Sequence, residues 1–189
     1  MKPKVFLISD THFGHTKMYE QPFLKEDGTR LRPWSNAAEA DQEMIRRWNA
    51  VIRPCDKTYV LGDFAMRASG VAVAEKLNGS KILILGNHDI FGAKKYLQYF
   101  KDVRSCHMLD GILLSHIPIH PDSLGKAIGN VHGHLHYRSI LSSNKVDPRY
   151  LCVCVEQTGY APIAWEDVKK RFTKQQDEIQ RTIKTRPLK

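Results

Sequence analysis

The stretch that decides the fold is Val5-Phe6-Leu7-Ile8-Ser9-Asp10-Thr11-His12. Its apolar run predicts a buried strand over residues 4–9, because strands covered on both faces carry apolar side chains at successive positions. Asp10 and His12 follow at once, so a carboxylate and an imidazole stand where the strand ends. In an extended segment, side chains two positions apart point the same way. We therefore expect Asp10 and His12 to face one site.

Four further motifs along the chain also place polar residues directly after a short apolar run. They are Gly62-Asp63, Gly86-Asn87-His88-Asp89, Ser115-His116 and Gly133-His134-Leu135-His136. Strands expected over 58–61 and 81–85, with a short helix over 71–77 between them, predict a sheet covered by helices. Ligands of open α/β sheets bind beyond the carboxyl ends of the strands. The motifs therefore predict one shared site at that edge.

The other expected elements complete an α/β pattern. Asn36 and Glu39 have the spacing of a helix-capping pair. The helix that follows has an apolar stripe made of Met44, Ile45, Trp48, Val51 and Ile52. Beyond residue 100 we expect strands over 103–108, 111–115, 127–132 and 150–156, and a polar helix from residue 166. Residues 1–168 are expected to form one domain, followed by a basic helix or tail over 169–189.

The side chains gathered in the five motifs are those of a metal centre. Imidazole, carboxylate and amide ligands together suit Mn²⁺, Fe, Zn²⁺ or Ni²⁺ better than Ca²⁺. Two such ions about 3.5–4 Å apart can activate a bridging hydroxide and neutralise both oxygens of an in-line displacement at phosphorus. Each motif alone is weak, since residues such as Gly, Asn and Asp also favour simple turns. Their combination in this order predicts a two-metal hydrolytic centre.

The order and spacing of the motifs resemble those of the calcineurin-like metallophosphoesterases. The likeness runs from residue 4 to about residue 139. Three stretches resemble in particular a compact bacterial and phage branch of that superfamily. They are Ile8-Ser9-Asp10-Thr11-His12-Phe13-Gly14-His15, Leu61-Gly62-Asp63-Phe64-Ala65 and Leu114-Ser115-His116-Ile117-Pro118. The resemblance implies an α/β fold in which two β-sheets form a sandwich flanked by helices.

The resemblance also implies a role for each motif residue. The ligands expected on one ion are Asp10, His12 and His136. Those expected on the second are Asn87, His116 and His134. Asp63 would bridge both ions, and His88 would contact the substrate phosphate and protonate the leaving oxygen, which makes these two the expected catalytic residues. The expected cofactor is a pair of ions, with manganese first and Fe, Zn, Ni or Mg as alternatives.

One position departs from the protein Ser/Thr phosphatases of the superfamily. Their second motif is Gly-Asp-x-x-Asp-Arg-Gly, in which the second Asp orients the catalytic His. Met66 occupies that position here, so His88 lacks that carboxylate, and Asp89 is not assumed to replace it. Arg67 keeps the position of the motif's Arg. This position suits a contact with a substrate phosphate and is equally consistent with a solvent-exposed side chain. The expected substrate-contacting residues are His15, Arg67, Asn87 and His88.

The composition bounds the class of protein. A chain of 189 residues with 42% hydrophobic residues can form one domain without disulfides. No apolar run approaches the roughly 20 residues of a membrane helix, and the run over 5–8 is too short for a secretory signal. The four cysteines form no C-x-x-C pair. We therefore expect a cytoplasmic protein with no membrane partner, in which Cys152 and Cys154 are small buried residues rather than metal ligands.

The positive charge gathers at the C-terminus. The net charge is +9, and residues 169–189 carry eight Lys or Arg against two Asp or Glu. Such a tail either contacts a polyanion such as nucleic acid or forms a solvated helix face. We expect an enzyme that hydrolyses phosphodiesters, in nucleotides or small phosphate esters, by attack of the metal-bridging hydroxide. The alternatives are a DNA or RNA nuclease and a non-catalytic interaction scaffold on the same fold.

Overall fold

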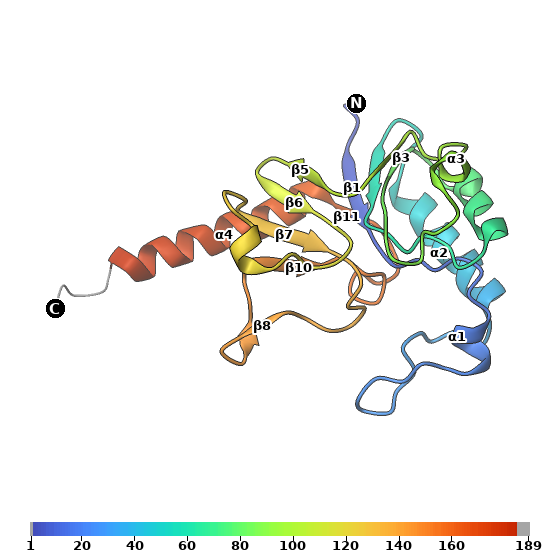
Figure 1. Cartoon of the computed structure of the whole chain (residues 1–189), viewed down its shortest axis with the longest axis horizontal. Helices are drawn as coiled ribbons and strands as arrows, with labels where there is room; N and C mark the ends of the chain where they lie inside the picture. The colour runs from blue at the N-terminus through green and yellow to red at the C-terminus, as the bar shows by residue number, and fades with distance from the viewer. Residues whose placement is uncertain (1, 185–189) are drawn as a thin grey trace.

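The first of the two main sheets has five strands. The computed structural model describes the backbone of residues 2–184 and the side chains of residues 2–174. The strands of this sheet, in spatial order, are β11 (Ile163–Ala164), β1 (Val5–Ile8), β2 (Lys57–Val60), β3 (Ser80–Ile84) and β4 (Asp102–Arg104). Strands β1 to β4 run parallel, and β11 is antiparallel to β1. The carboxyl ends of β1, β2 and β3 therefore lie side by side (Figure 1).

The second main sheet has four strands. Its strands, in spatial order, are β10 (Tyr150–Cys152), β7 (Gly129–His132), β6 (Ile112–Leu114) and β5 (His107–Leu109). Strand β7 is parallel to both β6 and β10, and β5 is antiparallel to β6. A separate hairpin consists of β8 (Leu141–Ser142) and β9 (Lys145–Val146).

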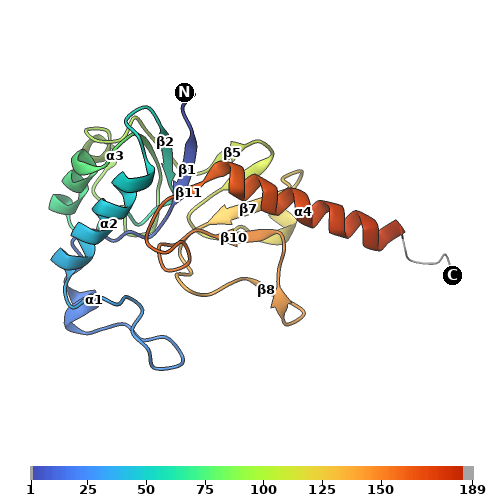
Figure 2. The same ribbon diagram turned by 180° about the vertical axis from the view of Figure 1, so that it is seen from behind.

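The helices differ widely in length. They are α1 (Lys17–Glu20), α2 (Ala37–Val51), the 3₁₀ helix η1 (Ala68–Lys76), α3 (Ala93–Tyr96), the 3₁₀ turn η2 (Pro121–Ser123) and α4 (Trp165–Lys184). Helix α2 begins as expected, because the Asn36 side chain accepts a hydrogen bond of 2.9 Å from the Glu39 backbone N–H. Figures 1 and 2 show α2 beside the five-stranded sheet and α4 running past the four-stranded sheet. Among the described residues, no helix has the length and apolar character needed to cross a bilayer.

Two hydrophobic clusters cover the two faces of the five-stranded sheet, because successive side chains of a strand point to opposite faces. Ile8 belongs to the cluster that includes Met44 and Trp48 of α2. Leu7 belongs to the cluster that includes Leu114 and Val131 of the second sheet. The expected α/β fold, a two-sheet sandwich flanked by helices, is confirmed.

Some expected elements differ in the structure. The single strand expected over 103–108 is wrong, because β4 and β5 belong to different sheets and the chain passes between them at residues 105–106. The helix expected over 71–77 is a 3₁₀ helix that begins at Ala68. Val51, assigned to the apolar stripe, is exposed at the end of α2. A short apolar run predicts a strand but does not specify which sheet it joins.

Helix α4 crosses the domain boundary expected at residue 168. Phe172 is buried and belongs to the cluster between the sheets, so α4 is packed onto the domain as far as this residue. Residues 185–189 of the expected basic tail lie outside the described residues.

Candidate metal centre

The five motifs meet at the carboxyl ends of the two sheets. Asp10 follows β1, Asp63 follows β2, His116 follows β6, and the 133–136 motif follows β7. Backbone hydrogen bonds join neighbouring motifs: Asp10 N–H donates to the Gly62 carbonyl at 3.0 Å, and Gly133 N–H donates to the His116 carbonyl at 2.9 Å. The edge of the sandwich thus gathers residues that are far apart in the sequence.

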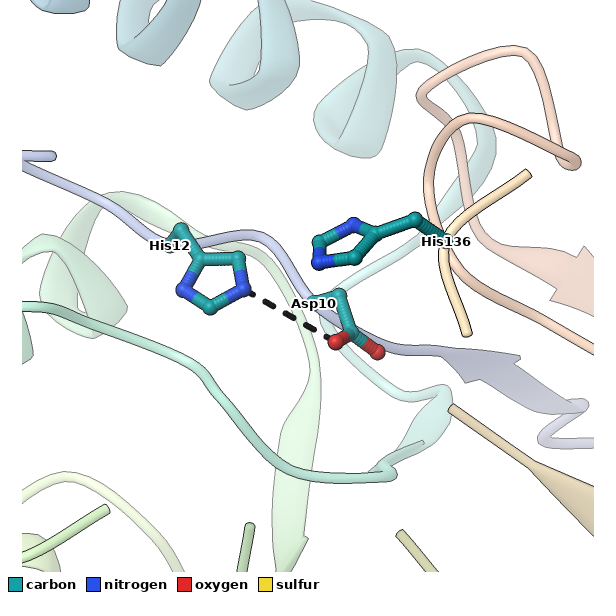
Figure 3. Close-up of side chains that lie close together, drawn as sticks. All are labelled: Asp10, His12 and His136. Atoms are coloured by element: carbon teal, nitrogen blue, oxygen red, sulfur yellow. Dashed lines mark ion pairs between the residues drawn. The ribbon is translucent and has the colours of Figure 1, made fainter. Parts of the chain in front are cut away.

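One group of potential metal ligands consists of Asp10, His12 and His136. One ligand atom from each residue lies within 4.8 Å of the others. His12 Nε2 is 3.7 Å from Asp10 Oδ1, and the rings of His12 and His136 stack with their centroids 5.4 Å apart. Figure 3 shows the His136 ring and the Asp10 carboxylate beside the His12 ring. These are the three residues expected on the first ion.

The second group consists of Asp63, His116 and His134, again with ligand atoms within 4.8 Å. Asp63 Oδ2 is 3.4 Å from His116 Nε2 and 3.7 Å from His12 Nε2. Asn87 Oδ1 lies 2.9 Å from the same His116 nitrogen. One oxygen of Asp63 is therefore near both groups, and Asn87 adjoins the second.

The buried polar atoms of the first group fit a cation. Asp10 Oδ1 and both ring nitrogens of His12 are buried and have no hydrogen-bond partner among the described residues. A buried polar atom without a partner costs about 1–3 kcal/mol, and a metal ion bound to the Asp10 oxygen and one His12 nitrogen would remove that cost for these two atoms. Imidazole nitrogen and carboxylate oxygen are suitable donors for divalent transition metals.

The backbone of the motifs is strained. The residues with positive φ include five expected ligands: Asp10 (58°), His12 (50°), Asp63 (52°), His134 (70°) and His136 (53°). This conformation costs non-glycine residues about 1–2 kcal/mol each, and such strain clusters at functional sites. Asp10 and His12 converge through left-handed turns, so the extended geometry assumed from their spacing is wrong although the two side chains do meet.

Charges within the site shift its pKa values. Burial acts to lower the pKa of His116, but Asp63 and Asp10 raise it to about 9. Burial acts to raise the pKa of Asp63, which is nevertheless lowered, chiefly by His116. Without a metal, His116 is therefore a cation at neutral pH. A metal ion that binds the ring nitrogen must displace its proton.

Comparison with known proteins identifies the family. A family model described as calcineurin-like phosphoesterase matches residues 3–180. The chain belongs to this family. It is also 30% identical to an uncharacterized protein of Methanocaldococcus jannaschii, over 95% of this chain and 96% of that protein. Together with the two ligand groups, this membership supports a metal-dependent phosphoesterase.

A solved structure shares the architecture of this phosphoesterase. It is that of a protein of unknown function from Aquifex aeolicus, with a TM-score of 0.63 and 25% sequence identity. The similarity covers 89% of this chain and 99% of that one. The shared fold thus includes both sheets that carry the motifs.

Asp10 of the phosphoesterase is held through one of its two oxygens. Its Oδ2 accepts hydrogen bonds from Ser9 Oγ at 2.5 Å, the His134 backbone N–H at 2.9 Å and the Cys154 thiol at 3.1 Å. Burial raises the pKa of the Cys154 thiol, so the thiol keeps the proton that it donates. Oδ1 is left free for a metal ion. Cys154 is buried as expected, but its contact with Asp10 was not predicted.

A buried ion pair supports the same group from behind. Arg32 Nε lies 2.9 Å from Glu156 Oε1, and that oxygen lies 3.2 Å from His136 Nδ1. Arg32 also donates to the backbone carbonyls of Thr11 at 2.8 Å and Asp10 at 2.5 Å. Sequence reasoning missed both charged residues. The only signals were an Arg between the first strand and the helix that follows Asn36, and a Glu at the end of the strand expected over 150–156.

The Asp89 carboxylate binds backbone N–H groups rather than the His88 side chain. It accepts hydrogen bonds from the backbone N–H groups of Asp63 at 2.7 Å, Gly86 at 2.9 Å and Phe64 at 3.1 Å. The His88 backbone N–H donates to Asp63 Oδ1 at 2.8 Å. The His88 side chain is exposed, and its ring centroid is 5.6 Å from that of His12. His88 therefore stands at the rim of the site.

The expected substrate-contacting residues lie around the same rim. The His15 ring centroid is 5.7 Å from that of His12, and burial lowers the pKa of His15 to about 4. Arg67 is exposed, and its Nη2 donates to Thr16 Oγ1 at 2.9 Å. The structure thus brings His15 beside the first ligand group and places Arg67 beside the turn that follows His15.

Proposed function

We propose that the chain is a dinuclear-metal-dependent phosphodiesterase that hydrolyses nucleotides or small phosphate esters. The observation that carries this proposal is the position of Asp63, whose Oδ2 lies 3.4 Å from His116 Nε2 and 3.7 Å from His12 Nε2. A single carboxylate oxygen between two ligand groups is suited to bridging two ions. We expect manganese first, with Fe, Zn, Ni or Mg also compatible with these ligands.

Seven residues of the chain would hold the two ions. We assign Asp10, His12 and His136 to one ion. We assign Asn87, His116 and His134 to the other. Asp63 would bridge them. A metal pair supplies an activated hydroxide and neutralises charge on the phosphoryl oxygens. Cys154, the thiol that contacts Asp10, retains its proton and is a poor nucleophile. This favours direct displacement without a phosphoenzyme.

His88 is proposed as the general acid. Its backbone is anchored to Asp63 Oδ1 at 2.8 Å, while its imidazole is exposed beside His12. We propose that this ring protonates the leaving oxygen of a phosphate ester bound at the ligand groups. A positioned general acid contributes about 10²–10⁴-fold to the rate, so loss of His88 should reduce turnover.

The test compares bis(p-nitrophenyl) phosphate with p-nitrophenyl phosphate, with added Mn²⁺, for the wild type and His88→Ala. We expect metal-dependent diester cleavage that falls at least 100-fold in the variant while its bound metal is unchanged. A preference for the monoester would indicate a phosphatase instead. Two bound metals without turnover on either substrate would overturn the proposal and favour the interaction scaffold.

A nuclease remains the second candidate, because helix α4 displays basic residues. Lys170, Arg171 and Lys174 are exposed along it, and phosphate contacts dominate affinity for nucleic acids. The test replaces all three residues by Gln, since removal of residues 169–189 would also remove the buried Phe172. A nuclease that uses this face would show weaker polynucleotide binding and a shallower salt dependence. An unchanged salt dependence would exclude this role for the described part of α4.

A further inference from the structure

A small cavity lies beside the first ligand group. Its volume is about 220 Å³, and it is lined by Gly14, His15, Thr16, Lys17, Met66 and Arg67. These residues belong to the segments that follow β1 and β2, the same segments that carry Asp10, His12 and Asp63. His15 connects the two places, since it lines the cavity and its ring centroid is 5.7 Å from that of His12.

The cavity wall is cationic. Lys17 and Arg67 are both exposed, and neither forms an ion pair with a described residue. The Arg67 guanidinium is oriented by its 2.9 Å hydrogen bond to Thr16 Oγ1. Asp41, the carboxylate that contacts this segment, accepts from the Gly14 backbone N–H at 3.0 Å. The two cations are therefore available to an anion in the cavity.

The two segments that form the cavity are fixed to each other. Phe13 and Ala65 form a parallel bridge, and the Met66 N–H donates to the Phe13 carbonyl at 3.1 Å. Both loops are thus anchored to the sheet edge next to the residues that contribute the cations. A preformed site loses less free energy in ordering when it binds a ligand.

We propose that this cavity binds a second phosphate group of the substrate, so that esters with two neighbouring phosphates are preferred over those with one. A guanidinium and an ammonium group together match a phosphate, through directed hydrogen bonds and through charge. The volume is below that of a pocket for a whole drug-sized ligand, which favours a single small anionic group. This inference rests on the proposed function, because it assumes that the scissile phosphate lies at the metal centre.

The experiment compares ADP with AMP, which differ only in the second phosphate. Each is tested as an inhibitor of bis(p-nitrophenyl) phosphate hydrolysis with Mn²⁺ in saturating excess. Each is also tested by the rise in melting temperature that it causes in the metal-loaded protein. The variants are Lys17→Gln and Arg67→Gln, both at exposed positions. Lys126→Gln is the matched control, because this exposed lysine lies before the amino end of β7, away from the metal centre.

We expect ADP to bind the wild type and the control about tenfold more tightly than AMP. Each cavity variant should lose most of this preference, because it should lose more affinity for ADP than for AMP. Equal binding of the two nucleotides, or a preference that survives both substitutions, would overturn the inference. The melting measurements separate it from the proposed function: an ADP preference without diester cleavage would retain the subsite and reject the phosphodiesterase. Diester cleavage without a preference for ADP would support the phosphodiesterase and reject the subsite.

Discussion

Glu156 lies directly behind His136: its Oε1 atom is 3.2 Å from the ring Nδ1. The same carboxylate is paired with the buried Arg32, and the Glu156 pKa is lowered, because the charges of Arg32 and His136 outweigh the effect of burial. Glu156 thus stays ionised at ion-pair distance from the imidazole. A carboxylate behind a metal-binding histidine commonly sets both the tautomer and the direction of the ring.

Glu156→Gln should weaken metal binding at the first ligand group. Loss of such a supporting carboxylate typically costs 10–100-fold in metal affinity, and the second group should keep its ion because it does not contact Glu156. Calorimetric titration with Mn²⁺, together with the metal content after dialysis, measures both sites. Glu75→Gln, at an exposed position of η1, is the matched control. If Glu156→Gln bound two ions with wild-type affinity, the positioning role would be wrong.

Gly133→Ala should disturb the first ligand group through Asp10. A Cβ atom at this position would overlap Ser9 Oγ and Asp10 Oδ2, so Asp10 would have to move. A displacement of about 1 Å in a catalytic site can cost about 100-fold in rate, and we expect such a loss together with weaker binding of the first ion. Gly125→Ala is the control: its Cβ would meet nothing within 4 Å, and only its φ of +57° is unfavourable. It should lower the melting temperature slightly and leave metal content unchanged.

Metal binding at the second group should release a proton. The pKa of His116 is raised to about 9, so below that pH a metal ion has to displace the proton of the imidazolium. The apparent affinity for Mn²⁺ should then rise about tenfold between pH 7 and pH 8. Calorimetry in buffers of different ionisation enthalpy counts the protons directly. A binding enthalpy that is independent of the buffer would contradict the prediction.

Asp41 should make stability depend on pH away from the ligand groups. Burial raises its pKa from 3.8 to about 6, so the folded state binds this proton more tightly than the unfolded state does. The resulting stabilisation is complete below about pH 4 and is lost as the pH rises through 6. Asp41→Asn keeps an acceptor for the Gly14 N–H. The free energy of unfolding of this variant should therefore be about 1 kcal/mol higher than that of the wild type at pH 7.5, after allowance for partial solvent exposure.

The measurement for Asp41 is urea unfolding at pH 4.5, 6 and 7.5. The advantage of Asp41→Asn over the wild type should shrink steadily as the pH falls, because the wild-type carboxyl group becomes neutral. A difference that stays constant across this range would show that the carboxylate is not destabilising in the folded protein.

The layers of the fold and the shared position of the motifs follow from local patterns. Continuous apolar residues in Val5–Ile8 indicate a strand buried on both faces, and the structure places such a strand at β1. Polar residues such as Asp10 and Asp63 come directly after such runs. Parallel neighbours end at a common edge, so these residues have to be close. Separation along the chain does not matter for this argument, because each strand brings its own motif to the edge.

The sequence by itself determined the buried strands, the capped helix α2 and the family to which the chain belongs. Tertiary structure alone decided which sheet each short strand joins and which residues stand behind the ligands. Arg32 and Glu156 are 124 positions apart, and Cys154 and Asp10 are 144 apart. Nothing in the residues beside them distinguishes these side chains, because local patterns encode backbone conformation and burial. The partner of a buried charge or thiol depends on how distant segments pack together.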